Sequence, residues 1–266
     1  MAAHANAHID SETRLVALLG HPVSHSLSPR MQNAAFRALG LNWAYIALDV
    51  EPDRVREAVR GLAALGFAGA NVTIPHKTAV IPFCDEVDPE ALRAQSVNTL
   101  VIRDGRIHGS STDGLAVTQA VRAAGERALV LGAGGAAKAV AVALAEAGAE
   151  VVVAARRPEQ AEVLARLCGG TTAAWPPSAD GYGILLNTTP VKDAVAVAPV
   201  PGQQVVDMAY NRDGTPTALV AAARAAGCGV IVDGADILAG QGAASFARWT
   251  GVEAPVAVMR AALDLA

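Results

Sequence analysis

Short apolar runs alternate along the chain with longer segments in which apolar residues recur every three or four positions. The short runs are typical of buried strands, and the longer segments are typical of helices with one buried face. Strands are expected over residues 14–20, 43–50, 67–74, 150–156, 184–190, 204–210 and 230–234, and a strand, turn and helix over 128–148. Further helices are expected over residues 28–40, 52–66, 158–169 and 217–227 and in two segments at the C-terminal end. This alternation predicts parallel sheets of the α/β class.

Local signals set several boundaries within this pattern. Residues 97–111 are expected to form a β-hairpin, because Asp104 and Gly105 suit its turn. Ser28 is a candidate N-cap for the first helix. The strand–helix rhythm restarts after Thr112–Gly114, which predicts two α/β units. The C-terminal helices could belong to either unit.

Composition and charge limit the class of protein. The 266 residues are 52% hydrophobic and only 4% aromatic, which predicts a core of alanine, valine and leucine. The length fits two domains of roughly 100–200 residues each. A net charge of −4 without a basic run argues against a nucleic-acid partner. No run approaches the roughly 18 apolar residues of a membrane span, so no membrane partner is expected.

The N-terminal residues and the cysteines bear on location. Residues 1–13 are small and polar and lack the apolar stretch of a signal peptide, so a flexible extension and a cytoplasmic protein are expected. Cys84, Cys168 and Cys228 are widely spaced and odd in number. They fit neither a disulfide framework nor a metal site, and no metal is expected.

A glycine-rich turn provides the first chemical signal. Gly132, Gly134 and Ala137 form a G-x-G-x-x-A pattern directly after an apolar strand and at the start of an alanine-rich helix. Such glycines allow a tight turn and let backbone N–H groups approach a pyrophosphate, which the helix N-terminus also attracts. A purely structural turn is the alternative, but the matching context favours a dinucleotide site.

The end of the next strand indicates which dinucleotide. An acidic residue there would bind the ribose 2′-hydroxyl of NAD, whereas this chain has Arg156 and Arg157 and no carboxylate. Two guanidinium groups can bind a 2′-phosphate, so NADP is the expected cofactor. An ordinary solvated arginine pair is the alternative.

Polar stretches interrupt the apolar pattern of the first unit at four expected strand ends. They cover residues 24–29, 71–77, 96–100 and 111–114. Because the carboxyl ends of parallel strands meet at one rim of a sheet, these side chains are expected to lie together. Their hydroxyls, amides, single cation and single carboxylate suit a small polyhydroxylated acid. Any one of these residues alone would be an ordinary turn residue.

Seven motifs together resemble the shikimate dehydrogenase family. In chain order they are GHPVSHSLSP, GANVTIPHK, SVNTL, STDG, GAGGAAKA, DMAY followed by GTP, and DG followed by Gln241. The resemblance runs from Arg14 nearly to the end. It implies an N-terminal α/β substrate-binding domain over residues 14–112, to which 236–266 return. A Rossmann-like, doubly wound NADP-binding domain is implied over 113–235.

The resemblance also implies an activity and a set of site residues. The activity is the reversible, NADPH-dependent reduction of 3-dehydroshikimate to shikimate in aromatic amino-acid biosynthesis. Lys77 and Asp113 match the catalytic pair. The implied substrate residues are Ser26 and Ser28 for the carboxylate, and Asn71, Thr73, Asn98, Tyr210 and Gln241 around the ring hydroxyls. The implied cofactor-binding residues are Gly132, Ala133, Gly134, Gly135, Ala136, Ala137, Arg156, Arg157, Thr188, Met208 and Gly234.

The identity of Lys77 has a chemical reason. Hydride reduction of a ketone produces an alkoxide that needs a proton, which an adjacent ammonium group can donate. The Asp113 carboxylate would orient that ammonium group. Arginine does not deprotonate usefully and would not serve. The alternative is a surface lysine paired with an acid. The histidines His21, His25 and His76 are expected to be structural or to lie at the rim.

Departures from the family pattern leave other readings open. Ala155 and Arg157 flank Arg156 where Asn and Thr are usual, and Gln160 stands where a second cofactor-binding arginine is common. Asp236 replaces a small residue near the expected nicotinamide position. Quinate or an amino analogue of shikimate are alternative substrates, and a non-catalytic dinucleotide-binding protein is an alternative of another class. A homodimer is also expected.

Overall fold

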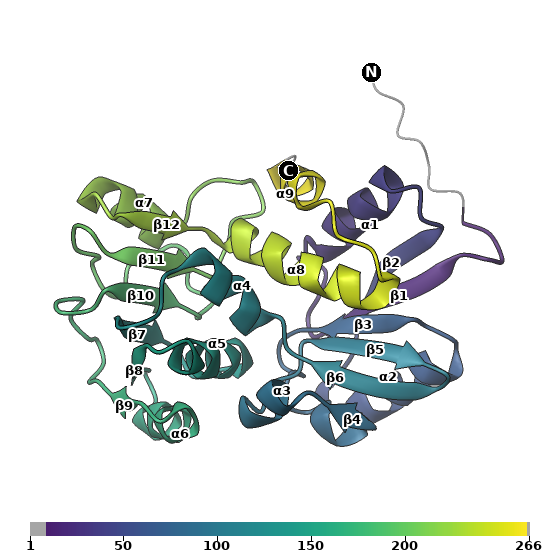
Figure 1. The fold of residues 1–266 in the computed structure, drawn as a ribbon, viewed down its shortest axis with the longest axis horizontal. Coiled ribbons are helices and arrows are strands. Elements are labelled where there is room, and N and C mark those ends of the chain that lie inside the picture. The colour runs from purple at the N-terminus through teal and green to yellow at the C-terminus, as the bar shows by residue number, and fades with distance from the viewer. Residues whose placement is uncertain (1–8, 265–266) are drawn as a thin grey trace.

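The computed structural model describes residues 9–264, which form two six-stranded sheets that lie side by side (Figure 1). The sheet of the first α/β unit has the order β2-β1-β3-β5-β6-β4, and the sheet of the second unit has the order β12-β11-β10-β7-β8-β9. The first six strands are β1 (Arg14–Gly20), β2 (Trp43–Asp49), β3 (Gly69–Val72), β4 (Glu86–Val87), β5 (Thr99–Arg103) and β6 (Arg106–Ser110). The other six are β7 (Arg127–Leu131), β8 (Glu150–Ala154), β9 (Thr171–Thr172), β10 (Ile184–Asn187), β11 (Gln204–Asp207) and β12 (Val230–Val232).

Helices cover both faces of each sheet. The first unit contains α1 (Ser28–Ala38), α2 (Val55–Ala64) and α3 (Pro89–Arg93), with short 3-10 turns at Pro52–Arg54 and Ile81–Phe83. The remaining helices are α4 (Asp113–Ala120), α5 (Gly135–Glu146), α6 (Pro158–Cys168), α7 (Ala218–Ala226), α8 (Gly234–Thr250) and α9 (Val256–Asp264).

The central strands are apolar along their whole length because both of their faces are covered. In β1, Val16 and Leu18 pack with residues of α1, α8 and α9, whereas Ala17 and Leu19 pack with residues of α2 on the other face. Successive side chains of a strand point to opposite faces, so a continuous apolar run supplies two cores. The strand β7 is divided between two cores in the same way.

The two sheets differ in strand direction. All strand pairs of the second sheet are parallel, and the winding direction reverses between β7 and β10. In the first sheet β5 runs antiparallel to β3 and β6, so the start of β5 lies at the same rim as the ends of β1, β3 and β6. Residues 96–98 therefore lie at the polar rim although they precede β5. From the sequence, only the carboxyl ends of strands were expected there.

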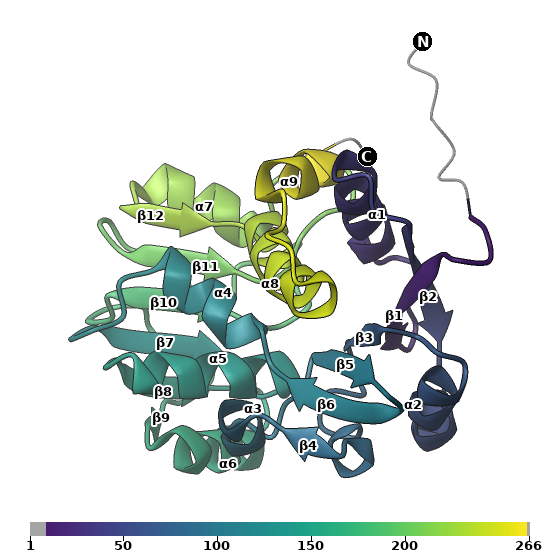
Figure 2. The same ribbon diagram turned by 45° about the vertical axis from the view of Figure 1, so that its right-hand side comes forward.

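The last two helices return to the first unit. In both views α8 leads from β12 back to the first sheet, and α9 lies beside α1 (Figures 1 and 2). Phe246 and Trp249 of α8 and Met259 of α9 are buried in the core around α1 and β1. The Trp249 indole N–H also donates to the Leu100 carbonyl at 2.9 Å, which ties α8 to β5.

Several local expectations need correction. Ser28 is the first residue of α1 rather than its cap, because Leu27 holds the N-cap position and no side chain caps this end. The helices α3 and α4 and the two-residue strands β4 and β9 were not expected. The hairpin is confirmed, with Asp104 and Gly105 both at positive φ in its turn.

The N-terminal extension lies only partly within the described residues. Residues 1–8 are outside them, whereas the Asn42 side chain accepts from Thr13 at 2.7 Å and donates to Asp10 at 2.9 Å. The chain is thus held from Asp10 onward. Within residues 9–264, no helix has the length and apolarity needed to cross a membrane.

Candidate active site

A cleft between the two units contains two adjoining pockets. All of the expected catalytic and substrate residues line the first pocket: Ser26, Ser28, Asn71, Thr73, Lys77, Asn98, Asp113, Tyr210 and Gln241. Ala136, Thr188, Met208 and Gly234, all expected at the cofactor, also line it. The second pocket is lined by Gly132, Ala133, Gly134, Arg156 and Arg157, again with Thr188. Gly135 and Ala137 line neither.

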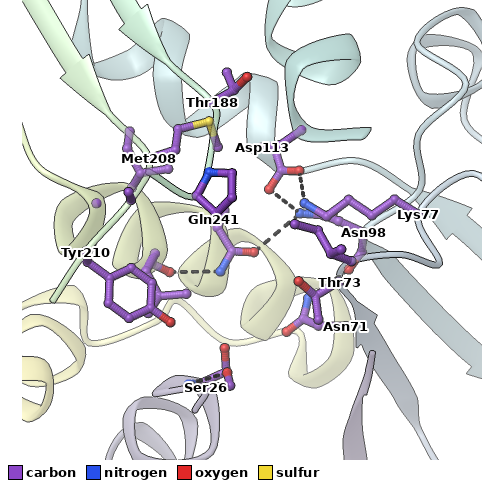
Figure 3. A pocket seen from close by; sticks show the side chains of 18 of the residues that line it. Ser26, Asn71, Thr73, Lys77, Asn98, Asp113, Thr188, Met208, Tyr210 and Gln241 are labelled. Atoms are coloured by element: carbon purple, nitrogen blue, oxygen red, sulfur yellow. Dashed lines mark hydrogen bonds and ion pairs between the residues drawn. The ribbon is translucent and has the colours of Figure 1, made fainter. Parts of the chain in front are cut away.

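Lys77 and Asp113 form a nearly buried ion pair in the first pocket (Figure 3). The Lys77 ammonium donates to Asp113 Oδ2 at 2.5 Å, and the two side chains are 11% and 4% exposed. The other carboxylate oxygen accepts from Asn98 Nδ2 at 2.8 Å. Asp113 is also the first residue of α4, where the helix N-terminus favours a negative charge. The pair can thus present a fixed ammonium group to a ligand.

The backbone around Lys77 is fixed by contacts with both units. The neighbouring His76 is buried and donates from Nε2 to the Val50 carbonyl at 2.7 Å, a structural role as expected. The Lys77 carbonyl accepts from the Val97 amide at 2.8 Å. On its other side, a Cβ added at Gly135 would lie 3.0 Å from the Lys77 Cβ. Gly135 therefore allows the glycine loop of the second unit to approach the lysine stem.

Buried amides extend the site from the catalytic pair. Asn98 Nδ2 also donates to Thr112 Oγ1 at 3.0 Å and to Gln241 Oε1 at 3.3 Å. Asn71 Nδ2 donates to Ser245 Oγ at 2.9 Å, while Asn71 Oδ1 accepts from the Tyr45 hydroxyl at 2.9 Å. Most donors and acceptors of the two asparagines are thus satisfied by the protein, which fixes their orientation.

Two of the groups that hold these amides, Tyr45 and Ser245, were missed in the sequence, whereas Thr99 and Thr112 belong to polar stretches expected at the rim. The hydroxyls or backbone of all four lie within the same buried network. Burial raises the pKa of Tyr45 far above its ordinary value, so this phenol remains a neutral donor. No motif marks Tyr45 or Ser245, since hydroxyl side chains in strands and helices are common.

Ser26 and Tyr210 lie at the opposite end of the first pocket (Figure 3), and Ser28 also lines this pocket. The Ser28 amide donates to Ser26 Oγ at 3.2 Å. Ser26 lies in the turn before α1, and Ser28 is the first residue of that helix. Tyr210 belongs to the second unit but lies close to Ser26 and Leu27 of the first unit. Burial raises the pKa of Tyr210, whereas the Leu27 backbone, the Arg212 charge and the Ser26 side chain lower it to a smaller extent. The phenol therefore stays neutral and lies where the two units meet.

The second pocket has the shape and charge for a phosphate-bearing dinucleotide. Gly132 has φ +111°, and a Cβ there would lie 2.6 Å from Thr188 Oγ1, so only glycine fits. Beside Gly134, at the start of α5, a Cβ would meet open space. Arg156 and Arg157 follow β8, and neither forms an ion pair within residues 9–264. Ala137 is instead buried between α5 and the sheet.

A buried carboxylate shapes the loop between the pockets. Asn187 Oδ1 accepts from the Thr189 amide at 3.0 Å, and Asn187 Nδ2 donates to Asp207 Oδ1 at 2.8 Å. Asp207 Oδ2 accepts from Thr217 Oγ1 at 2.5 Å. Burial raises the pKa of Asp207, although its hydrogen bonds oppose that shift. The hydrogen bonds among Asn187, Asp207 and Thr217 were not expected from the sequence. They position Thr188 and Thr189 beside both pockets.

The unusual Asp236 has a structural partner. The guanidinium of Arg260, on α9, contacts Asp236 at 2.6 Å, Asp233 at 3.2 Å and Asp264. Asp233 also caps α8 by accepting from the Asp236 amide at 2.9 Å. This cluster fixes α9 to the start of α8, next to Gly234 and Ile237 of the first pocket.

Comparisons with known proteins agree with this geometry. Three family models match the chain: "Shikimate dehydrogenase substrate binding domain" over residues 18–100, "Shikimate / quinate 5-dehydrogenase" over 114–180 and "Shikimate 5'-dehydrogenase C-terminal domain" over 234–263. The shikimate dehydrogenase (NADP(+)) of Moorella thermoacetica is 47% identical over 94% of this chain and 92% of its own length.

Solved structures are similar over almost the whole chain. A shikimate dehydrogenase crystallised with NADP+ superposes with a TM-score of 0.89 at 34% identity, covering 96% of both chains. The Thermus thermophilus shikimate 5-dehydrogenase crystallised with shikimate gives a TM-score of 0.85 at 37% identity, covering 94% of this chain and 98% of that one.

Proposed function

The chain belongs to the shikimate dehydrogenase family, and we propose that its Lys77–Asp113 pair carries out the NADP-dependent, reversible reduction of 3-dehydroshikimate to shikimate. In a cell this reaction serves aromatic amino-acid biosynthesis. The observation that carries the proposal is the position of the pair. It lies in the first pocket, which adjoins a second pocket lined by the two arginines that follow β8.

The residues of the second pocket fit NADP. The turn at Gly132 leaves no room for a side chain, and Gly134 opens onto free space at a helix N-terminus. Backbone N–H groups there can bind a pyrophosphate. Arg156 and Arg157 would hold the 2′-phosphate, and Ala136, Met208 and Gly234 would lie towards the nicotinamide, which supplies a hydride when bound.

The chain itself supplies the proton and the orientation of the substrate. As the ketone is reduced, its oxygen gains negative charge, and the Lys77 ammonium donates a proton to that oxygen. Asp113 holds the ammonium group in place and can accept from an adjacent ring hydroxyl. Ser26 and Ser28 bind the carboxylate at the opposite end, while Asn71, Thr73, Asn98, Tyr210 and Gln241 surround the hydroxyls. In the oxidation of shikimate the same groups act in reverse.

Steady-state oxidation of shikimate and of quinate, each with NADP+ and with NAD+, tests the proposal. A large kcat/KM for shikimate with NADP+ alone is the expected result. Comparable rates with quinate or NAD+ would indicate a dual-substrate or catabolic relative. No turnover in any of the four assays would contradict the proposal and favour an amino-analogue or non-catalytic role.

The cellular location and the assembly state are further parts of the proposal. A cytoplasmic location is supported by the free state of Cys84, Cys168 and Cys228, which suits a reducing compartment. Fractionation of the source cells tests it. The homodimer remains a prediction, and light scattering on the purified protein would measure the mass directly.

A further inference from the structure

Two basic side chains line the first pocket without forming an ion pair. Lys192 lies in the loop after β10, and Arg212 lies in the loop after β11. Neither takes part in an ion pair or a side-chain hydrogen bond within the part of the chain that the structure describes. Neither has a role in the proton transfer proposed above.

These two cations leave the first pocket positively charged. Lys77 also lines it, but Asp113 neutralises that charge at 2.5 Å. Asp113 is the one carboxylate among the described residues that line this pocket. Asp213 is exposed outside the pocket lining, and its pKa is lowered mainly by hydrogen bonds from Thr215 and least by the charge of Lys192. A chain of net charge −4 therefore has a positive pocket.

The two cations do not lie where the phosphates of the dinucleotide are expected. Lys192 and Arg212 do not line the second pocket, where Arg156 and Arg157 lie. Arg212 is also close enough to Tyr210 for its charge to oppose the rise that burial causes in the pKa of that phenol. Tyr210 and Ser26 lie in the same part of the first pocket (Figure 3), so Arg212 lies towards the serine end of that pocket.

The backbone beside each cation is anchored, while the side chains are partly or fully exposed. The Lys192 carbonyl accepts from the Ala218 amide at 2.8 Å, at the start of α7. Next to Arg212, Asn211 Nδ2 donates to the carbonyls of Thr215 at 3.2 Å and Pro216 at 3.3 Å. Both loops belong to the second unit, whereas Ser26 and Ser28 belong to the first.

We propose that Lys192 and Arg212 form a cationic arm that recognises the carboxylate of the acidic substrate from the side of the second unit. The inference rests on the proposed function, because it adds charge attraction to the hydrogen bonds assigned to Ser26 and Ser28. Hydroxyls already donate stronger hydrogen bonds to a carboxylate than to its ester, and a cation adds a charge attraction that the ester lacks. Because the two side chains reach solvent, their attraction acts during encounter and weakens with salt.

The test compares K192Q, R212Q and the double variant with the wild type. The control is R224Q, which removes an exposed arginine of α7 outside both pockets. The assays measure kcat/KM for shikimate at low and high ionic strength, kcat/KM for shikimate methyl ester, and KM for NADP+. The double variant should lose about tenfold in kcat/KM for shikimate at low ionic strength, through KM. It should also lose most of the salt dependence and part of the preference for acid over ester, the rest being retained by Ser26 and Ser28.

Other outcomes separate the possible failures. Wild-type salt dependence and acid preference in the double variant would overturn the inference while leaving the proposed function intact. A rise in KM for NADP+ instead would assign the cations to the cofactor and also overturn it. If the wild-type enzyme does not turn over shikimate, the proposed function fails and the inference fails with it. The charge-preserving variants K192R and R212K should remain near wild type, which excludes a loss of folding as the cause.

Discussion

Lys77 combines the features that proton donation to an alkoxide requires. Its ammonium group is nearly buried, bonded to a single carboxylate and held by backbone contacts with Val97 and close packing against Gly135. Water competes little for such a group, so its charge acts strongly on an adjacent oxygen. An arginine would present a wider planar group that cannot give up a proton at ordinary pH.

Replacement of Lys77 should therefore affect chemistry more than cofactor binding. K77A is expected to lower kcat by roughly 10²- to 10⁴-fold, the usual loss for a general acid, with NADPH affinity close to wild type. Stopped-flow or steady-state assays and NADPH fluorescence titration measure the two quantities. K138A, which removes a half-buried lysine of α5 that lines neither pocket and donates to Gln95 Oε1 at 3.5 Å, should behave as wild type. An equal loss of NADPH binding in K77A would show that the lysine is structural.

Arg156 and Arg157 should determine the choice between the two dinucleotides. The R156A/R157A variant is expected to weaken NADPH much more than NADH, because only NADPH carries the 2′-phosphate. Fluorescence titration with both cofactors gives the ratio of Kd values. R166A, which removes an arginine of α6 paired at the surface with Glu162, is the control. An unchanged ratio in the double variant would refute the 2′-phosphate assignment.

At this scale the sequence revealed residues that belong to motifs but not the residues that support them. Lys77, Asp113 and Asn98 could be predicted because each stands in a distinctive polar stretch. Ser245 could not, since it meets Thr99 only in space. The hydroxyl oxygens of these two residues are 2.8 Å apart, although the residues are 146 positions apart in the chain.

Among the elements, β10, β11 and α7 meet at the buried Asp207. The carboxylate joins Asn187 at the end of β10 to Thr217, which caps α7 by accepting from the Val220 amide at 3.2 Å. One ionisable group therefore connects two strand ends and a helix start. The loop at Thr188 and Thr189 depends on this arrangement.

Asp207 should make stability depend on pH in a defined direction. Burial raises its folded-state pKa, so the neutral carboxyl favours the folded protein at low pH and this contribution disappears as pH rises through that pKa. D207N lacks this titration, so its Tm relative to wild type should increase from about pH 3 to about pH 8. D193N, an exposed carboxylate variant, should show a constant difference. A difference in Tm between D207N and wild type that does not change with pH would contradict a raised pKa for the buried Asp207.

Long periodic elements could be predicted and short ones could not. Helices such as α5 and α6 have clear start signals and several turns of repeating apolar residues, whereas β4 and β9 have only two residues each. The helix α4 was missed because Asp113, Gly114, Ala116 and Val117 are all buried, so it lacks the polar and apolar faces by which helices are found.

On the scale of the whole molecule, Ile74 links the two units at the cofactor. It is the one described residue of the first unit that lines the second pocket, and it lines the first pocket as well. Its side chain is 61% exposed, which is unusual for an isoleucine held between fixed backbone contacts. A bound dinucleotide would cover this side chain.

I74A should therefore weaken NADP+ binding. The lost apolar contact should reduce the binding free energy by about 1 kcal/mol, which corresponds to about a fivefold rise in Kd. The increase in Tm that NADP+ produces should therefore be smaller than in the wild type. Calorimetric titration and thermal unfolding with NADP+ measure both. L65A, which shortens a 76% exposed leucine far from the pockets, is the control. An unchanged Kd would show that the side chain stays in solvent when NADP+ binds.

The presence of two α/β units could be inferred from the restart of the strand–helix rhythm, whereas the destination of the C-terminal helices was implied only by the family resemblance and not by their apolar pattern. Their apolar faces fit any sheet equally well. The placement of α8 and α9 on the first unit depends on matched surfaces, such as Phe36 stacked on Phe246 at 5.1 Å between ring centroids.

The return of α8 and α9 has a consequence for how the chain matures on the ribosome. All strands of the second sheet lie between residues 127 and 232, so that unit can assemble as soon as this segment has emerged. The first sheet emerges earlier but keeps one apolar face covered only in part, by α1, until Phe246, Trp249 and Met259 have been synthesised. Synthesis adds about 5–20 residues per second, so this face stays partly exposed for several seconds, and the part of the protein made first is completed last.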